Sequence, residues 1–170
     1  LTGTDGVTYT YSLYKDYSTF PLTSGDGTYQ VGVYENVSDD RYTTLLSETF
    51  SVTLTDPLKP YLYPNQYVNF TADSLPLAKA EELADGASSD LDIISSVYNY
   101  IITHFTYDYS KASSVTSGYL PDIDEVFTSE KGICFDYAAV MTFLMIAVIL
   151  VLMQKSYLFF PKFMPNSEAS

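Results

Sequence analysis

The spacing of apolar residues changes along this chain from a period of two to a helical period, and that change constrains the fold most strongly. Three segments near the start alternate apolar and polar side chains, namely 7–13, 29–33 and 50–54. Such alternation is typical of half-buried β-strands. Two clusters of turn-forming residues, 23–27 and 35–40, separate these segments. We therefore expect an antiparallel β-sandwich-like module over residues 1–55.

A proline-rich stretch follows this module. Pro57, Pro60 and Pro64 cannot donate ladder hydrogen bonds and restrict the residues before them to extended conformations. We interpret residues 56–70 as a linker between two units. Because the pattern beyond the linker is helical, the predicted fold class is α+β.

Three helices are predicted between the linker and residue 130. Ser74 is placed to cap a helix that ends at about residue 85, and Asp90 is placed to cap a longer one. The apolar face of the longer helix consists of Leu91, Ile94, Tyr98, Ile101 and Phe105. Asp122 marks the start of a short helix over residues 122–128.

The chain contains a single cysteine, Cys134, so it cannot form an internal disulfide. This residue follows Lys131-Gly132-Ile133 and precedes an apolar run of helical character, which places the thiol at a helix N-terminus. Unpaired N–H groups and the helix dipole stabilise a thiolate there. Gly132 allows a tight entry that leaves the sulfur facing a cleft rather than the core. Cys134 is therefore a candidate catalytic nucleophile.

The motif Lys131-Gly132-Ile133-Cys134-Phe135-Asp136-Tyr137-Ala138-Ala139 resembles the nucleophile motif of the transglutaminase-like superfamily, which shares its core with papain-like thiol proteases. Residues 98–109 and 117–127 are similar to what precedes the cysteine in secreted bacterial members, which also carry a β-rich N-terminal module. The resemblance implies an incomplete papain-like α/β unit over residues 71–145. Its catalytic residue would be Cys134, supported by the motif residues Lys131, Gly132, Asp136 and Tyr137. It implies no cofactor and no metal, and a protein or peptide substrate attacked at a carboxamide or peptide carbonyl.

The same resemblance implies a Cys-His-Asp triad whose histidine and carboxylate lie after the cysteine. No histidine follows Cys134 in this sequence. The single histidine, His104, lies near the end of a predicted helix, where an imidazole is commonly a surface group. We therefore expect an incomplete site with little or no turnover.

The chain carries no charge from residue 137 to residue 153. A membrane-spanning helix usually needs about 20 apolar residues, and a buried core helix is commonly shorter. We favour a core helix, because a spanning helix would include the segment that supports Cys134. The alternative is a membrane-anchored or cell-surface binding module without catalysis, with Lys155 and Lys162 on the cytoplasmic side. Residues 146–170 form an atypical tail, for which one hypothesis is a truncated or frame-shifted product.

Acidic residues outnumber basic ones by 21 to 8, which gives a net charge of −13. A surface of this charge repels phosphate backbones, and the basic residues do not cluster, so nucleic acids are excluded as partners. Resemblance to secreted proteins implies an extracellular or cell-surface location for this chain, in which we identify no signal peptide. Helix faces that lack the family's remaining strands would be exposed, so we also expect self-association.

Two further features have simpler interpretations. Asp122, Asp124 and Glu125 suggest a cation site, but the twelve-residue calcium loop is absent, so we interpret them as carboxylates of a first helical turn. A third functional hypothesis is carbohydrate binding by the N-terminal sheet, because 17 tyrosines occur in the chain and aromatic faces stack on sugars. Alternating tyrosines are more often an ordinary sheet face.

Overall fold

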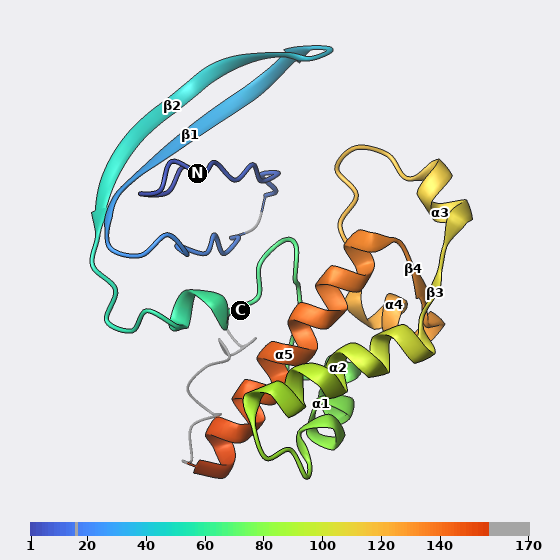
Figure 1. Ribbon diagram of the computed structural model, residues 1–170. Helices are drawn as coiled ribbons and strands as arrows, with labels where there is room; N and C mark the ends of the chain where they lie inside the picture. Colours follow the sequence, from blue (N-terminus) through green and yellow to red (C-terminus); the bar gives the residue numbers. More distant parts are fainter. Residues whose placement is uncertain (16, 157–170) are drawn as a thin grey trace. The chain divides into compact units, whose positions relative to one another are not determined.

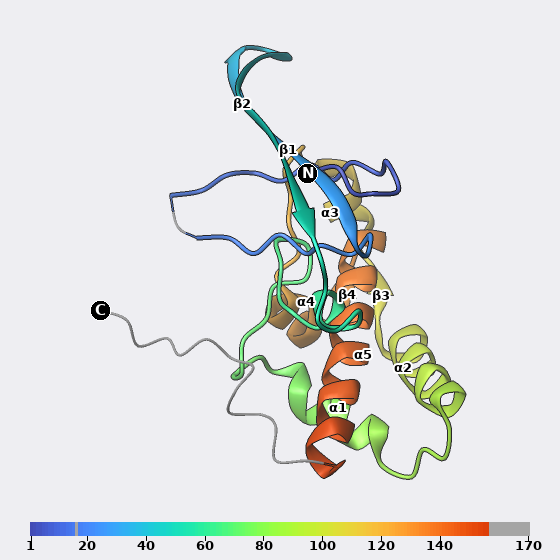
Figure 2. The same cartoon turned by 90° about the vertical axis from the view of Figure 1, so that its left-hand side faces the viewer.

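The computed structural model describes residues 1–15 and 17–156, and the chain divides into two compact units, 1–63 and 64–170. Both helices and strands occur among the described residues, which confirms the α+β class. Figures 1 and 2 show the elements of each unit. The unit over residues 1–63 is called the N-terminal unit below, and the other the C-terminal unit.

A long curved hairpin dominates the N-terminal unit (Figure 1). Its strands are β1 (Gly27–Ser38) and β2 (Arg41–Val52), which pair antiparallel from Gly27↔Val52 to Ser38↔Arg41. Asp39 adopts a positive φ of 45° in the two-residue turn, and the Asn36 side-chain amide donates a hydrogen bond to its carbonyl oxygen at 2.6 Å. The expected turn over 35–40 is therefore shorter, because residues 35–38 continue the strand.

The predicted β-sandwich is not confirmed. Among the described residues of this unit, one two-stranded sheet is present, followed by the short 3-10 helix η1 (Lys59–Tyr61). Residues 7–13 form no strand, although Thr2 makes isolated bridges to Thr8 and Gln30. A sandwich buries the inner faces of two sheets. Here the only buried apolar side chains among the described residues of the unit are Tyr29 and Leu62.

Helix α5 (Cys134–Ser156) is the centre of the C-terminal unit. Helices α1 (Pro76–Ala84), α2 (Asp90–His104) and α4 (Ile123–Ser129) pack against it (Figures 1 and 2). A helix that is apolar on all sides is expected to be surrounded by other elements. Its fully buried side chains include Val140, Phe143, Leu144, Ala147 and Val148. The core of this unit is thus built around α5.

The remaining elements of the unit are short. They are β3 (Thr106–Tyr107), α3 (Tyr109–Ser114) and β4 (Lys131–Gly132), and β3 pairs parallel with β4. A larger papain-like sheet is not confirmed by the described residues. The predicted boundary at residue 145 falls inside α5, and residues 146, 147, 148, 150 and 151 are buried, whereas residues 157–170 of the predicted tail lie outside the described part.

The predicted apolar face of α2 is confirmed at its end, where Ile101 and Phe105 are buried, and wrong over its first three residues. Leu91, Ile94 and Tyr98 are 69%, 42% and 52% exposed. The buried residues of the helix are instead Ile93, Val97, Tyr100 and Ile101. Both sets have helical spacing, and packing against α5 decides between them. The cap also differs, because the Ser89 side chain accepts a hydrogen bond from the Asp92 N–H, and Asp90 is the first helical residue.

Of the two other predicted helix starts, one is confirmed and one is wrong. Asp122 lies at the start of α4 as predicted, and it caps this helix, since its Oδ1 accepts a hydrogen bond from the Glu125 N–H at 3.0 Å. Ser74 does not cap α1, because its hydroxyl accepts from the Thr71 N–H. The Leu75 N–H at the start of α1 donates instead to Asp124 Oδ1 at 2.8 Å. No side chain of a described residue caps α1, and a carboxylate of α4 binds the N–H of the residue before the helix.

Candidate nucleophile site

The first turn of α5 presents Cys134 at the surface of the C-terminal unit. Cys134 is the first residue of the helix, and its thiol is free and exposed. The Ile133 carbonyl accepts a hydrogen bond from the Tyr137 N–H at 3.1 Å, which closes the first turn. The sequence prediction of a thiol at a helix start therefore matches the position of Cys134.

Two short parallel strands fix the chain just before this cysteine. The Thr106 N–H donates to the Glu130 carbonyl at 2.9 Å, and the Asp108 N–H donates to the Gly132 carbonyl at 2.9 Å. Glu130 ends α4 in the left-handed region with a φ of 49°, so the chain reverses before it enters β4. The segment that leads into Cys134 is thus held between α4 and β3.

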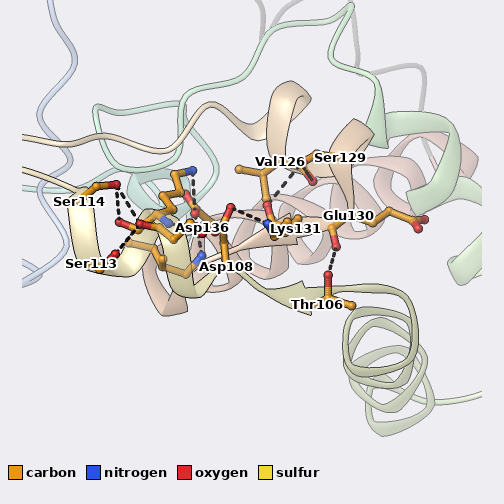
Figure 3. A network of polar contacts seen from close by, with 12 residues as sticks. Thr106, Asp108, Ser113, Ser114, Val126, Ser129, Glu130, Lys131 and Asp136 are labelled. Atoms are coloured by element: carbon orange, nitrogen blue, oxygen red, sulfur yellow. Dashed lines mark hydrogen bonds and ion pairs between the residues drawn. The ribbon is translucent and has the colours of Figure 1, made fainter.

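Asp136 anchors the first turn from inside. Its side chain is fully buried, and its Oδ2 accepts a hydrogen bond from the Ile133 N–H at 2.8 Å. The Tyr119 hydroxyl donates to Oδ1 at 2.5 Å, and the Lys111 ammonium lies 2.9 Å from Oδ2. Figure 3 shows Asp136 within this polar network. The motif carboxylate therefore binds the helix entry itself.

Gly132 is required by packing. A Cβ at this position would lie 2.6 Å from the Asp136 Cβ and 2.9 Å from its Oδ2. Gly132 is not among the glycines with a positive φ. The absence of a side chain at Gly132 therefore lets the Asp136 carboxylate reach the backbone before the helix. We had expected this glycine to provide the backbone freedom of a tight turn, so the reason for it is different.

Lys131 points to a different carboxylate. Its ammonium lies 3.4 Å from Asp108 Oδ2, an ion pair drawn in Figure 3. The other Asp108 oxygen accepts a hydrogen bond from the Lys111 N–H at 2.9 Å and so caps α3. This backbone hydrogen bond is the main reason that the pKa of Asp108 is lowered, with Lys131 as a smaller contributor and desolvation opposing both. Lys131 thus ties β4 to the start of α3.

Aromatic rings surround the residues on both sides of Cys134. The Tyr137 ring contacts Phe105 and Tyr107, with ring centroids at 5.9 and 6.4 Å, and desolvation raises its pKa. The Phe135 ring contacts Tyr67 and Tyr119 at 6.1 and 6.3 Å. Tyr137, predicted as a motif residue, therefore packs the helix start against β3.

His104 lies at the end of α2 and makes local contacts. Its Nδ1 is 2.9 Å from both the Thr103 hydroxyl and the Tyr100 carbonyl, and its ring packs on Tyr100 at 4.4 Å. In the described part of the chain, no hydrogen bond or ring contact joins His104 to Cys134. The structure therefore places this imidazole as a helix-end group.

Sequence reasoning missed Lys111 and Tyr119. Tyr119 lies in the quoted stretch 117–127, but its hydroxyl meets Asp136 only through the tertiary fold. Lys111 likewise lies 25 positions before Asp136. A signal for Asp136 did exist, because an acidic residue at the third helical position commonly binds the N–H at the helix entry.

Two of the three carboxylates at the start of α4 accept hydrogen bonds from backbone N–H groups. Asp122 caps α4, and Asp124 accepts from the start of α1. Within residues 1–15 and 17–156, no group of three or more His, Cys, Asp or Glu side chains is arranged to hold a metal ion.

Comparison with known proteins gives one match. Residues 78–148 match the family model described as transglutaminase-like superfamily. Searches among curated proteins and among solved structures give no significant match. The matched segment contains α2, β3, α3, α4 and β4, together with the part of α5 that bears Cys134 and Asp136. This match supports the resemblance to the transglutaminase-like superfamily that the motif around Cys134 indicated.

Proposed function

We propose that Cys134 is the nucleophile of a transglutaminase-like cysteine site that transfers acyl groups from a protein or peptide substrate. One observation carries the proposal, namely that the single thiol is exposed on the first turn of α5 inside the matched segment. Backbone N–H groups at a helix start are unpaired within the helix and favour negative charge. A thiolate is the reactive form of cysteine.

The proposed reaction proceeds in two steps. The sulfur attacks the carbonyl carbon of a carboxamide or peptide, an S–C bond forms, and the C–N bond breaks. The proton from the thiol leaves with the ammonia or amine. Water or a second amine then attacks the thioester and releases the thiol. Both steps need a group that moves protons.

Among residues 1–15 and 17–156, no hydrogen bond joins a base to the Cys134 thiol. His104 is engaged by Thr103 and Tyr100 within α2, and no histidine follows Cys134. We therefore propose that this chain alone has little turnover. On the basis of its resemblance to secreted bacterial members, we place the site in an extracellular or cell-surface protein.

Rescue by an external base tests the proposal. A 4-nitrophenyl ester of a blocked amino acid has a good leaving group and needs little help from an acid. We expect imidazole in solution to accelerate release of nitrophenol by the full chain, and we expect Cys134→Ser to abolish the imidazole-dependent part. Equal rates for both proteins at every imidazole concentration would refute a nucleophilic role for Cys134.

One observation favours the alternative of a membrane-anchored binding module. Residues Cys134–Leu152 of α5 are long and apolar enough to cross a membrane. However, more than half of this stretch is buried, and α5 packs against α1, α2 and α4, as the core helix of a soluble protein also does. Partition of the full chain into a detergent phase, with membrane binding that survives alkaline extraction, would support the alternative.

A further inference from the structure

The buried Asp136 carboxylate joins the first turn of α5 to two residues that lie far from it in sequence. We propose that Lys111 and Tyr119 are positioning residues, which fix the helix entry through Asp136 and thereby set the reactivity of the Cys134 thiol. This inference rests on the proposed function of Cys134. It adds two residues from α3 and the following loop to the site.

The Asp136 carboxylate is shared among three donors. Tyr119 binds Oδ1, whereas the Ile133 N–H and the Lys111 ammonium bind Oδ2. The donors come from three separate segments, namely the loop after α3, α3 itself and the residue before the helix. Asp136 therefore couples the entry of α5 to α3 and to the loop after it.

A buried carboxylate needs these partners. A charge without exposed surface is strongly disfavoured unless an opposite charge and hydrogen bonds compensate it. Lys111 provides the charge, and its ammonium also lies 4.5 Å from the centre of the Tyr119 ring. Desolvation lowers the pKa of Lys111, but hydrogen bonds with Tyr119 and Asp136 and the charge of Asp136 outweigh it and raise the pKa overall. Lys111 therefore stays charged beside Asp136.

Loss of Lys111 or of the Tyr119 hydroxyl should destabilise the first turn of α5. Without Lys111 or the Tyr119 hydroxyl, the carboxylate must turn toward solvent or another donor, and the Ile133 N–H loses its acceptor. The rest of α5 remains held by the apolar core around Val140 and Leu144. The first turn would therefore fray while the helix persists, and the N–H groups beside Cys134 would lose their common orientation.

Two measurements on the full 170-residue chain test this inference. Cys134 is the only cysteine, so the rate of alkylation by iodoacetamide at neutral pH reports on this thiol alone. We expect Tyr119→Phe and Lys111→Met each to lower that rate by about two- to fivefold, the size of a helix-dipole effect on one charge. We also expect faster hydrogen exchange at the Ile133 amide. Lys111→Arg should restore both values, since a guanidinium also donates to a carboxylate.

A matched control and a double variant separate positioning from general destabilisation. Tyr61→Phe removes a hydroxyl that donates to the Thr23 carbonyl in the N-terminal unit, and it should leave both readouts unchanged. Combining Tyr119→Phe with Lys111→Met should lower the rate by less than the product of the single effects, because both act through one carboxylate. Unchanged alkylation and exchange in folded single variants would overturn the inference, and so would fully multiplicative effects. If the wild-type site fails the ester assay, Ile133 exchange still tests the positioning, so the two failures are distinguishable.

Discussion

Gly132 and Asp136 approach so closely that any side chain at position 132 would collide with the buried carboxylate. The nearest atom to a Cβ at position 132 would be the Asp136 Cβ, at 2.6 Å. Asp136 cannot retreat easily, since Tyr119, Lys111 and the Ile133 N–H all hold it. The glycine before the cysteine is therefore part of the same arrangement as the carboxylate after it.

Gly132→Ala should destabilise the C-terminal unit by about 1–3 kcal/mol, the usual cost of forcing a methyl group into a packed site. Urea unfolding followed by circular dichroism measures this change. Gly32→Ala in β1 is the matched control, because its nearest neighbours are atoms of the Tyr34 side chain, which is 60% exposed and free to move. Equal small effects of the two substitutions would show that Asp136 yields to the added methyl group.

Ser89→Ala should destabilise the C-terminal unit by about 1 kcal/mol, because the Ser89 hydroxyl accepts the hydrogen bond that caps α2. The midpoint of thermal unfolding is a suitable measurement. Ser95→Ala lies at an exposed position inside the same helix and should be neutral or slightly stabilising, since alanine is the better helix former. A loss of stability at Ser95 as large as at Ser89 would argue against the cap.

Local signals predicted the parts of the site that are local in sequence. Asp122 caps a helix as its sequence context indicates, and Cys134 begins one. The β-strands around Tyr29 and Phe50 are also present, and these two rings pack at 5.9 Å. In each case the deciding interactions lie within a few residues or follow from a simple alternation.

Tertiary contacts determine the features of the fold that the sequence did not predict. The two apolar stripes of α2 have the same spacing, so only the position of α5 shows that Val97 rather than Tyr98 is buried. The acceptor for the N–H of Leu75, the residue before α1, comes from Asp124, 49 positions away. Likewise, alternation over residues 7–13 gave no information on whether a partner strand exists. Such choices depend on residues that no local window contains.

The exposed stripe of α2 should promote self-association, as the sequence also led us to expect. Leu91, Ile94, Tyr98 and Ile102 are all exposed on this helix. Ile94→Lys combined with Ile102→Lys should reduce binding of an apolar dye and shift sedimentation toward a monomer, because each lysine interrupts the apolar surface. Asn99→Lys is a control for added charge at an exposed polar position of the same helix. A wild-type chain that sediments as a monomer at all concentrations would contradict the prediction.

Alkaline pH should weaken the network around Asp136. In the folded chain the pKa of Tyr119 is raised from 10.0, first by desolvation and then by its hydrogen bond to Asp136. The pKa of Lys111 is raised from 10.5, because its hydrogen bonds and the Asp136 charge outweigh desolvation. Both groups therefore hold their protons more tightly in the folded chain. Their contribution to the free energy of unfolding is complete below their pKa values in the unfolded chain, and it is lost as the pH rises through their pKa values in the folded chain.

The free energy of unfolding should thus fall as the pH rises above about 10, where Tyr119 of the unfolded chain loses its proton. Tyr119→Phe and Lys111→Met should each make this fall shallower, since each removes one linked proton. Tyr67, Tyr100 and Tyr137 also have raised pKa values, so part of the fall should remain in both variants. If the slopes of Tyr119→Phe and Lys111→Met both equalled the wild-type slope, the protonated forms of these two residues would not stabilise the Asp136 network.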